Sequence, residues 1–204
     1  MSGARIVGVL LAGGSSSRMG SPKAGLALGG VTLAARAAAT LRQAVDECAP
    51  EGRECIQAGG EAVPGLEWPL WPDLRADGGP AAGIEAALTG AAPAPIVVLA
   101  LDLPLVPAGL LIDALDRVRA GAAIAAPRWQ DRWHPLCAAY RPAALPPLQV
   151  RLDAGDRDLQ GLLDELAVAI EEDALRAHGD PARTLLNVNT PADLETAAAL
   201  LAGT

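Results

Sequence analysis

The sequence Pro95-Ile96-Val97-Val98-Leu99-Ala100-Leu101 contains no polar side chain, and Asp102-Leu103-Pro104 follows it directly. A strand with one face in water alternates apolar and polar residues, whereas this run shows no alternation, so we expect both of its faces to be covered. Strands covered on both faces are typical of the middle of a parallel sheet. The run therefore predicts a central parallel strand and an α/β fold around it.

Shorter apolar runs alternate with helical patterns along the rest of the chain. Strands are predicted at 6–11, 54–58, 66–70, 122–126, 135–140 and 185–188. Helices are predicted at 32–48, 81–88, 108–120 and 191–202, with helical segments at 143–166 that break near Gly155. The alternation shows no internal repeat and no linker-like break. It predicts one α/β domain over residues 1–204, with a mostly parallel sheet and helices on both faces.

Composition and charge exclude several classes of protein. Apolar residues make up 51% and charged residues 20% of the 204 residues, which argues against disorder. The net charge of −8 does not provide the broad basic face that general nucleic-acid binding requires. No run reaches the roughly 18 apolar residues of a membrane helix, and the three cysteines form no C-x-x-C pair. We therefore expect a cytoplasmic protein without nucleic-acid or membrane partners.

A loop rich in glycine and serine follows the first predicted strand. It reads Leu11-Ala12-Gly13-Gly14-Ser15-Ser16-Ser17-Arg18-Met19-Gly20-Ser21-Pro22-Lys23. Glycine allows backbone N–H groups to approach an anion closely, and Arg18 and Lys23 add positive charge, as a triphosphate requires. The Walker pattern and the dinucleotide fingerprint both fail to match. The loop thus predicts a phosphate site of another kind, with a flexible strand-to-helix connection as the structural alternative.

Asp102 follows the predicted central strand, at the edge where open α/β sheets bind ligands. If this strand lies beside the first one, Asp102 faces the glycine loop. A carboxylate repels phosphates unless a divalent cation lies between them, and Mg²⁺ is commonly bound by one or two carboxylates together with phosphate oxygens. The sequence predicts a magnesium site at Asp102, the alternative being a residue that caps the next turn.

Three further segments leave their roles open. Asp77 could accept hydrogen bonds from a guanine edge, or it could favour the positive end of a helix. Asn187 and Asn189 could reach a substrate from one face of a strand, although Thr190-Pro191 is explained by helix capping alone.

The third segment, His134-Pro135-Leu136, is bracketed by Arg128, Arg132 and Arg141, which could receive a second polyanionic substrate. No nucleophile motif accompanies His134, so the residues do not support a catalytic triad.

Taken together, these motifs resemble those of the molybdenum cofactor guanylyltransferase family of nucleotidyltransferases. The pattern L-A-G-G-x-S-x-R-M-G-x-x-K matches residues 11–23, G-P-x-A-G matches 79–83, D-x-P matches 102–104, and N-x-N-T-P-x-D-L matches 187–194. The order and spacing span nearly the whole chain. The resemblance implies a three-layer Rossmann-like fold that transfers GMP from GTP to the phosphate of molybdopterin and releases pyrophosphate.

The resemblance also implies site residues and partners. Catalysis would rest on Arg18, Lys23 and Asp102, with Asp102 holding Mg²⁺. Substrate contacts would come from Leu11, Ala12, Gly13, Gly14, Lys23, Gln57, Asp77, Gly79, Asp102, Asn187 and Asn189, the last two on the pterin side. Gln57 stands where the family often has an asparagine, and its longer amide could make the same bond. Molybdoenzymes or other cofactor-biosynthesis proteins would be the protein partners.

Rival readings remain. CMP transfer from CTP to the same cofactor is one, although the pair Gly13-Gly14 favours guanylyl transfer within the superfamily. Nucleotidyl transfer to a sugar phosphate or to phospholactate is another. A non-catalytic paralogue that binds nucleotide or cofactor is the third, and the presence of Lys23, Asp77 and Asp102 argues against it.

Overall fold

A mixed, mostly parallel sheet forms the centre of the computed structural model, which describes residues 5–12 and 23–203. In this described part of the chain the strand order is β5-β4-β1-β6-β9-β7-β10, and β8 pairs with β7 off this path. The strands are β1 (Ile6–Leu11), β4 (Arg53–Ala58), β5 (Leu70–Trp71), β6 (Ile96–Ala100), β7 (Ile124–Trp129), β8 (Arg132–Trp133), β9 (Cys137–Tyr140) and β10 (Ala167–Ile170).

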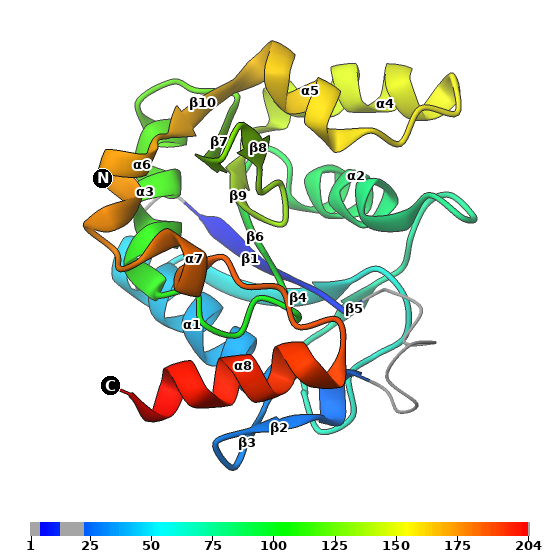
Figure 1. Cartoon of the computed structure of the whole chain (residues 1–204). Helices are drawn as coiled ribbons and strands as arrows, with labels where there is room; N and C mark the ends of the chain where they lie inside the picture. Colours follow the sequence, from blue (N-terminus) through cyan, green and yellow to red (C-terminus); the bar gives the residue numbers. More distant parts are fainter. Residues whose placement is uncertain (1–4, 13–22, 204) are drawn as a thin grey trace.

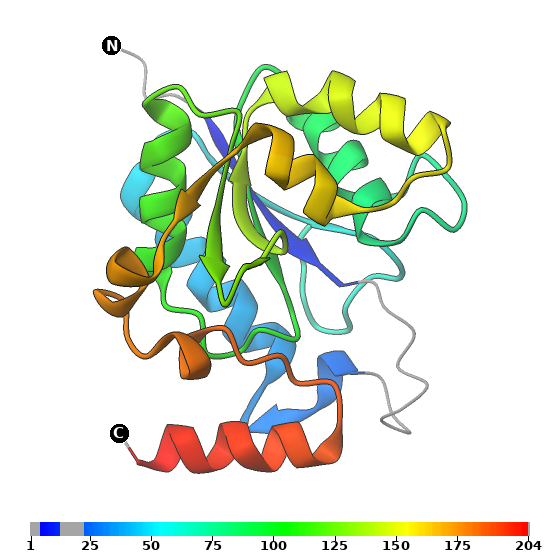
Figure 2. The ribbon, with the colours of Figure 1, turned by 45° about the horizontal axis from the view of Figure 1, so that its top comes forward.

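Helices cover both faces of this sheet (Figures 1 and 2). One face carries α1 (Leu33–Cys48) and α3 (Ala108–Arg119), and the other carries α2 (Gly79–Ala91), α4 (Leu145–Asp153) and α5 (Leu159–Leu166). The remaining helices are α6 (Glu172–Arg176), α7 (Pro181–Thr184) and α8 (Pro191–Ala202), with 3₁₀ turns η1 (Lys23–Gly25) and η2 (Pro142–Ala144). The predicted α/β class with three layers is confirmed.

The apolar runs lie where the sequence predicts. Every residue of β1 and β6 is buried, and the two strands pair in parallel with Val9 beside Val98 and Leu11 beside Ala100. The other neighbour of β6 is β9, which runs antiparallel with Leu99 beside Cys137. The central strand is therefore parallel to one neighbour only, because β9 runs against β6 and inserts between β6 and β7.

Two predicted strands differ from the structure. Residues 185–188 form no strand but an extended segment, in which Val188 N–H donates to the carbonyl of Asp102 at 2.8 Å. The strand predicted at 66–70 is reduced to Leu70–Trp71, because the preceding residues turn around the side chain of Gln57 instead of pairing. The short strands β8 and β10 and the hairpin of β2 (Ala27–Leu28) and β3 (Val31–Thr32) were not predicted.

Helix α8 and the β2–β3 hairpin pack together at the end of the sheet where β1 finishes (Figures 1 and 2). Leu28 of β2 and Ala197 of α8 belong to a small buried apolar cluster that also includes Leu33 at the start of α1 and Val188 before α8. This packing brings the segment before α8 next to η1, which begins at Lys23. None of the helices in residues 5–12 and 23–203 has the length and hydropathy that a bilayer crossing requires.

Candidate functional site

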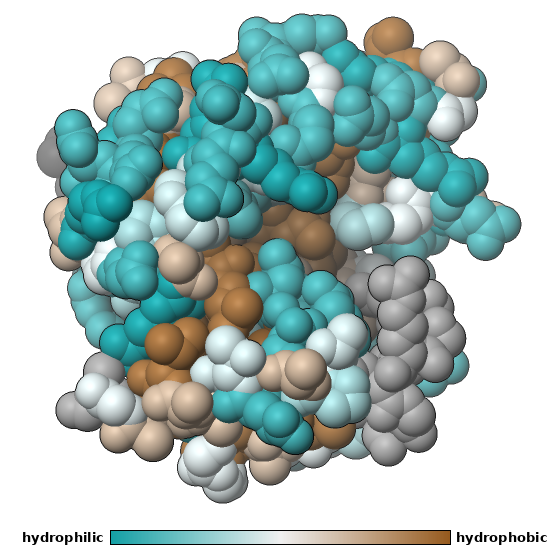
Figure 3. All heavy atoms as spheres, viewed as in Figure 1, coloured by the Kyte–Doolittle hydropathy of each residue, from teal (hydrophilic) through white to brown (hydrophobic). Residues whose placement is uncertain are grey.

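The strand order changes direction at β1, because β4 pairs with one of its edges and β6 with the other. Ligands of open α/β sheets bind outside the carboxyl ends of strands at such a switch point. The two strands end level with each other, and Leu101 N–H continues their pairing by donating to the carbonyl of Leu11 at 3.3 Å. Asp102 therefore lies beside the carboxyl end of β1, as predicted. Figure 3, in the orientation of Figure 1, shows the surface hollowed between the layer that carries α5 and helix α8.

Lys23 contacts two other predicted residues at this place. Its Nζ donates to Oδ1 of Asn189 at 2.5 Å and lies 3.8 Å from Oδ2 of Asp102. The side chains of Lys23 and Asp102 are only 17% and 23% exposed, so the pair is shielded but open to a ligand. The structure thus places Asp102 opposite the end of the glycine loop at Lys23, as expected, whereas the contact of Lys23 with Asn189 was not predicted.

The carboxylate of Asp102 has an unused binding position. Its Oδ1 is buried and has no hydrogen-bond partner among the described residues. Burial raises the pKa of Asp102, and the charge of Lys23 opposes this increase. A buried carboxylate oxygen without a donor is costly unless a ligand or an ion satisfies it. A carboxylate oxygen such as Oδ1 of Asp102 is a suitable ligand for a hard cation such as Mg²⁺.

The described ranges contain no group of three or more His, Cys, Asp or Glu side chains that could hold a metal ion. A magnesium ion at Asp102 would therefore draw its remaining ligands from water and from substrate phosphates, which is its usual coordination in phosphate-handling sites.

Asn189 is positioned by the first turn of α8. Oδ2 of Asp193 accepts hydrogen bonds from the backbone N–H groups of Asn189 at 2.9 Å and Thr190 at 2.8 Å, while Thr190 caps the helix. These backbone N–H groups, that of Asn189 first, lower the pKa of Asp193. Asn187 is exposed and Asn189 half-buried, so the two asparagines differ in environment. The role of Asp193 was not predicted, although aspartate three residues after a threonine cap is a recognisable capping pattern.

A second carboxylate with a buried oxygen, that of Asp73, lies on the β4 side of β1. Its Oδ1 is buried without a hydrogen-bond partner in residues 5–12 and 23–203. Burial raises the pKa of Asp73, and a hydrogen bond from the backbone of Gly59, just after β4, opposes the increase. Sequence reasoning missed Asp73, because nothing in its local pattern shows that the loop folds it inward.

Asp77 and Gly79, which were predicted, flank the start of α2. Asp77 is exposed and has a left-handed backbone with φ of 55°, and Gly79 has φ of 58° with open space where a side chain would project. Only Gly78 separates them. Both therefore lie at the positive end of a helix of 13 residues, which favours an anion.

The loop that carries Asp73 and Asp77 is held by Arg75. Its guanidinium forms a two-point contact with Glu85 of α2 (2.8 and 3.0 Å) and a third bond with Asp153 of α4 at 2.6 Å. Glu85 is only 2% exposed. A paired Arg–carboxylate contact of this geometry is among the stronger polar interactions in proteins, so the loop has one preferred position over α2.

Gln57 is buried in β4 and bonds to the loop that follows the strand. Its Nε2 donates to the carbonyls of Leu66 (3.2 Å) and Trp68 (2.7 Å), and its Oε1 accepts from Val63 N–H at 2.7 Å. A nucleotide contact from Gln57, as predicted, requires one of these bonds to be exchanged. The structure thus gives Gln57 a role in holding the loop.

The remaining predicted contacts involve the phosphate loop. Leu11 is 4% exposed, and its side chain packs beneath Gly83 of α2, where an added methyl group would lie 2.8 Å from Leu11 Cδ2. Ala12 is half-buried and donates its N–H to the carbonyl of Ala58 at 3.1 Å. The predicted residues Gly13, Gly14 and Arg18 lie outside the described residues.

The three arginines around His134 do not gather at one place. Arg128 and Arg132 lie where β7 turns into β8, whereas Arg141 follows β9 and donates to the carbonyl of Gly121 at 3.0 Å. Because β9 runs antiparallel to β6, Tyr140 is level with Ile96, so Arg141 lies at the opposite edge of the sheet from Asp102. The expectation that Arg141 helps to receive a substrate is therefore wrong.

A switch point with a lysine, a carboxylate that can accept a cation, and a helix start beside it defines a phosphate-binding α/β protein with the architecture of nucleotidyltransferases. The comparison with known families gives the narrower assignment: the chain belongs to the MobA-like NTP transferase domain family, which matches residues 8–175. A protein of Pelotomaculum thermopropionicum named probable molybdenum cofactor guanylyltransferase is 36% identical over 190 residues, covering 92% of this chain and 89% of that protein.

Solved structures agree on the fold. Molybdopterin-guanine dinucleotide biosynthesis protein A from Archaeoglobus fulgidus superposes with a TM-score of 0.76 at 26% identity, covering 97% of this chain and 100% of that one. Rv0371C of Mycobacterium tuberculosis, solved as a complex with manganese, superposes with a TM-score of 0.61 at 21% identity, covering 96% and 98% of the two chains. The second likeness concerns the fold alone.

Proposed function

We propose that this protein transfers GMP from GTP to the terminal phosphate of molybdopterin, forming the guanine dinucleotide cofactor and releasing pyrophosphate. The observation that carries the proposal is the contact of Lys23 with Asp102 and Asn189 at the switch point. It is supported by the full-length similarity to relatives named as guanylyltransferases. We also propose that residues 1–204 act as one domain in this reaction.

Lys23 and Arg18 contact the β- and γ-phosphates of GTP in this proposal, together with the backbone of Leu11, Ala12, Gly13 and Gly14. Asp102 holds the magnesium ion, whose charge would offset that of the triphosphate. Asp77, Gly79 and Gln57 lie toward the nucleoside, and Asn187 and Asn189 toward the pterin. Asp73 is added to the nucleotide side because its buried oxygen lacks a donor among the described residues.

The reaction is a direct displacement at the α-phosphorus of GTP. An oxygen of the acceptor phosphate forms a new bond to this phosphorus, and the bond to the bridging oxygen of the β-phosphate breaks, so pyrophosphate leaves with the electron pair. The acceptor phosphate is already anionic, so no general base is needed. Catalysis then rests on positioning and on stabilisation of the charge that develops on the leaving group. Lys23, fixed by Asn189, is the described cation placed for that task.

Thermal unfolding with GTP, CTP, ATP or UTP, each with and without Mg²⁺, tests the nucleotide. A ligand at 100 times its Kd stabilises the folded state by about 2.7 kcal/mol, which is a readily measured shift. We expect a shift in melting temperature with GTP but not with CTP, ATP or UTP, and we expect this shift to require Mg²⁺. A shift with CTP alone would transfer the proposal to the cytidylyl reaction, and no shift with any nucleotide would contradict it.

Release of pyrophosphate in a single turnover tests catalysis. We expect one pyrophosphate per active site when GTP, Mg²⁺ and molybdopterin are present together. Tight GTP binding without release would identify a binding protein instead. Delivery of the product to molybdoenzymes, or exchange with other cofactor-biosynthesis proteins, is part of the same proposal and is tested by co-purification with the cofactor bound.

A further inference from the structure

Arg128 lies at the carboxyl edge of the sheet, on the far side of β6 from β1. His134 N–H donates to the carbonyl of Pro127 at 2.9 Å, and Ala100 N–H donates to the carbonyl of Leu136 at 2.8 Å. These bonds place the end of β7 at the same level as the end of β6. Strand β6 ends at Ala100, which precedes Asp102 by two residues. With two strand spacings of about 4.8 Å each, the backbone of Arg128 is about 10 Å from that of Ala100.

The side chain of Arg128 points to the sheet face that carries α2 and α5. Residues that pair across a sheet share a face, and the pairings of β7, β9, β6 and β1 place Arg128 on the same face as Ala100 and Leu11. Leu11 in turn packs beneath Gly83 of α2. Arg128 therefore lies on the sheet face that carries α2 and α5.

The guanidinium of Arg128 has hydrogen-bonding capacity left over. Its Nε is buried and has no hydrogen-bond partner among the described residues. Its Nη2 lies 3.7 Å from Oδ1 of Asp131, a side chain that is completely exposed, so this ion pair contributes little and can be exchanged. With 39% of its side chain exposed, Arg128 can be reached by an anion.

Trp133 fixes the position of this guanidinium. The charged group lies 5.5 Å from the centre of the Trp133 ring, within the range of a cation–π contact. Trp133 is buried, and its Nε1 donates to Oδ1 of Asp164 at 2.7 Å. Its backbone N–H and carbonyl both bond to the side-chain amide of Gln160 at 3.0 Å. Arg128 thus rests on a platform that α5 holds in place.

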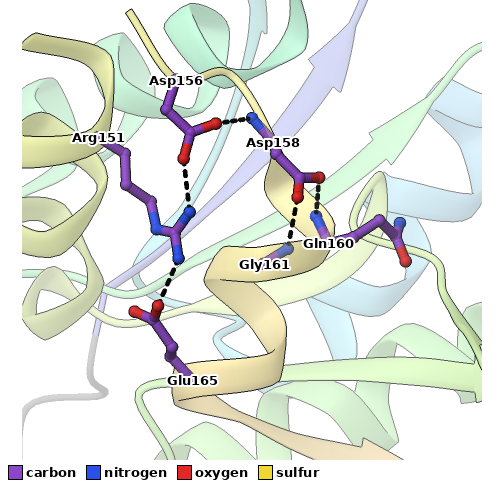
Figure 4. A network of polar contacts seen from close by, with 6 residues as sticks. All are labelled: Arg151, Asp156, Asp158, Gln160, Gly161 and Glu165. Carbon is purple, nitrogen blue, oxygen red and sulfur yellow. Dashed lines mark hydrogen bonds and ion pairs between the residues drawn. The ribbon is translucent and has the colours of Figure 1, made fainter. Parts of the chain in front are cut away.

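Helix α5 is itself firmly attached (Figure 4). Asp158 caps it by accepting from the backbone N–H groups of Gln160 at 2.9 Å and Gly161 at 3.1 Å. Arg151 of α4 joins Asp156, before the helix, at 2.6 Å, and Glu165, in its last turn, at 2.5 Å. The amide of Gln160 extends away from this network. Because these contacts hold the Trp133 platform in place, Arg128 would bind an anion with a smaller ordering cost than a freely moving side chain.

The geometry of an in-line displacement indicates which substrate phosphate would approach Arg128. The attacking and leaving oxygens lie on opposite sides of the reacting phosphorus. The glycine loop follows β1, and Lys23 lies beside Asp102, so pyrophosphate leaves on the β1 side. The acceptor phosphate must then enter from the side of β9 and β7. Arg128 lies at that edge, and its planar group matches the two-point geometry of a phosphate.

We propose that Arg128, on its Trp133 platform, binds the phosphate monoester of the acceptor substrate. This inference rests on the proposed function, since it names the residue that receives the acceptor in that reaction. Arg132 lies on the short strand β8 and is exposed, and Arg141 lies at the opposite edge of the sheet.

The test measures acceptor binding directly, without turnover. The probes are an air-stable, oxidised pterin phosphomonoester derived from molybdopterin and the same pterin after removal of its phosphate by a phosphatase. Binding of each to wild type, Arg128→Gln, Arg128→Lys and Arg141→Gln is followed by pterin fluorescence. Arg141→Gln removes the same charge at the opposite edge, and the GTP–Mg²⁺ melting shift of each variant reports on the nucleotide side.

We expect Arg128→Gln to weaken binding of the phosphomonoester about 10- to 100-fold, as for loss of a hydrogen bond to a charged group. Arg128→Lys should recover part of this loss, and Arg141→Gln should bind like wild type. All variants should keep the GTP–Mg²⁺ shift. The dephosphorylated pterin should bind wild type and Arg128→Gln equally.

Two results would overturn the inference: phosphomonoester binding within twofold of wild type in Arg128→Gln, or an equal loss for both pterins. Absence of GMP transfer by the wild type would instead overturn the proposed function. The comparison of pterin binding would still test whether Arg128 binds the phosphate, because it does not depend on turnover.

Discussion

Nζ of Lys23 donates a hydrogen bond of 2.5 Å to Oδ1 of Asn189, a residue 166 positions later in the chain. The bond joins the end of the glycine loop to the start of the last helix. Both groups lie beside Asp102, whose Oδ2 is 3.8 Å from the same nitrogen. The geometry of the lysine therefore depends on how α8 is attached, and this dependence can be tested at a residue outside the Lys23–Asp102–Asn189 contact.

Asp193 is the residue that attaches Asn189. Asp193→Ala removes the acceptor of two backbone N–H groups and should destabilise the fold by about 1 kcal/mol, as loss of a helix cap does. Because Asn189 loses its anchor, the GTP–Mg²⁺ melting shift should also fall. Asp158→Ala, which removes the cap of α5, is the matched control. An equal effect of the two substitutions on the GTP shift would show that Asp193 acts through stability alone.

Lys23→Ala and Asp102→Asn should each lower the rate of GMP transfer by about 10²–10³ or more, because each removes a charge that acts on the transition state. Both variants should remain folded, since neither side chain is part of the apolar core. Single-turnover pyrophosphate release measures the rate. Arg53→Ala, which breaks an exposed ion pair with Asp46, controls for loss of charge. Near-normal turnover in either variant would exclude that residue from the mechanism.

Breaking the Arg75–Glu85 pair should lower the free energy of unfolding by more than is usual for an ion pair at the protein surface. Arg75→Met leaves the carboxylate of Glu85, which is 2% exposed, without its two-point partner. Urea denaturation should show a clear loss of unfolding free energy, because a buried carboxylate without its partner is destabilising. The double substitution Arg75→Met/Glu85→Leu should recover much of this loss, because no buried charge remains. Arg176→Met, which breaks an exposed pair with Glu172, should change stability by less than about 1 kcal/mol. A double variant as unstable as Arg75→Met would contradict this account.

His134 should make stability depend on pH. Burial, and to a lesser extent the charge of Arg132, lowers the pKa of His134 from 6.5 to about 4. Between these two values the unfolded chain binds a proton that the folded chain does not, so this contribution to stability is complete above pH 6.5 and is lost as the pH falls toward 4. The unfolding free energy of wild type should therefore fall relative to that of His134→Gln as the pH is lowered over this range. A difference that stays constant from pH 7 to pH 4 would refute the assignment.

Features that depend on neighbouring residues in the chain could be predicted from the sequence. The run 95–101 becomes the buried centre of the sheet, and the helix from Pro191 begins and ends as its pattern indicates. Both depend on short-range physics: an unbroken apolar run must be covered on both faces, and a threonine followed by proline starts a helix. The placement of Asp102 beside β1 followed from the general rule for switch points.

Features that depend on pairing between distant segments could not be predicted. The antiparallel course of β9 moves Arg141 away from the site and leaves Arg128 near it, and nothing local to either arginine distinguishes them. Three further features depend on distant segments in the same way. They are the inward position of the Asp73 carboxylate, the hydrogen bond from Val188 to Asp102 where a strand was predicted, and the contact between Lys23 and Asn189. The sequence by itself determined the elements, their order and the chemical groups of the site. Only the tertiary structure decided which groups meet, because the register of the strands and the packing of α8 on the hairpin place side chains that local pattern does not connect.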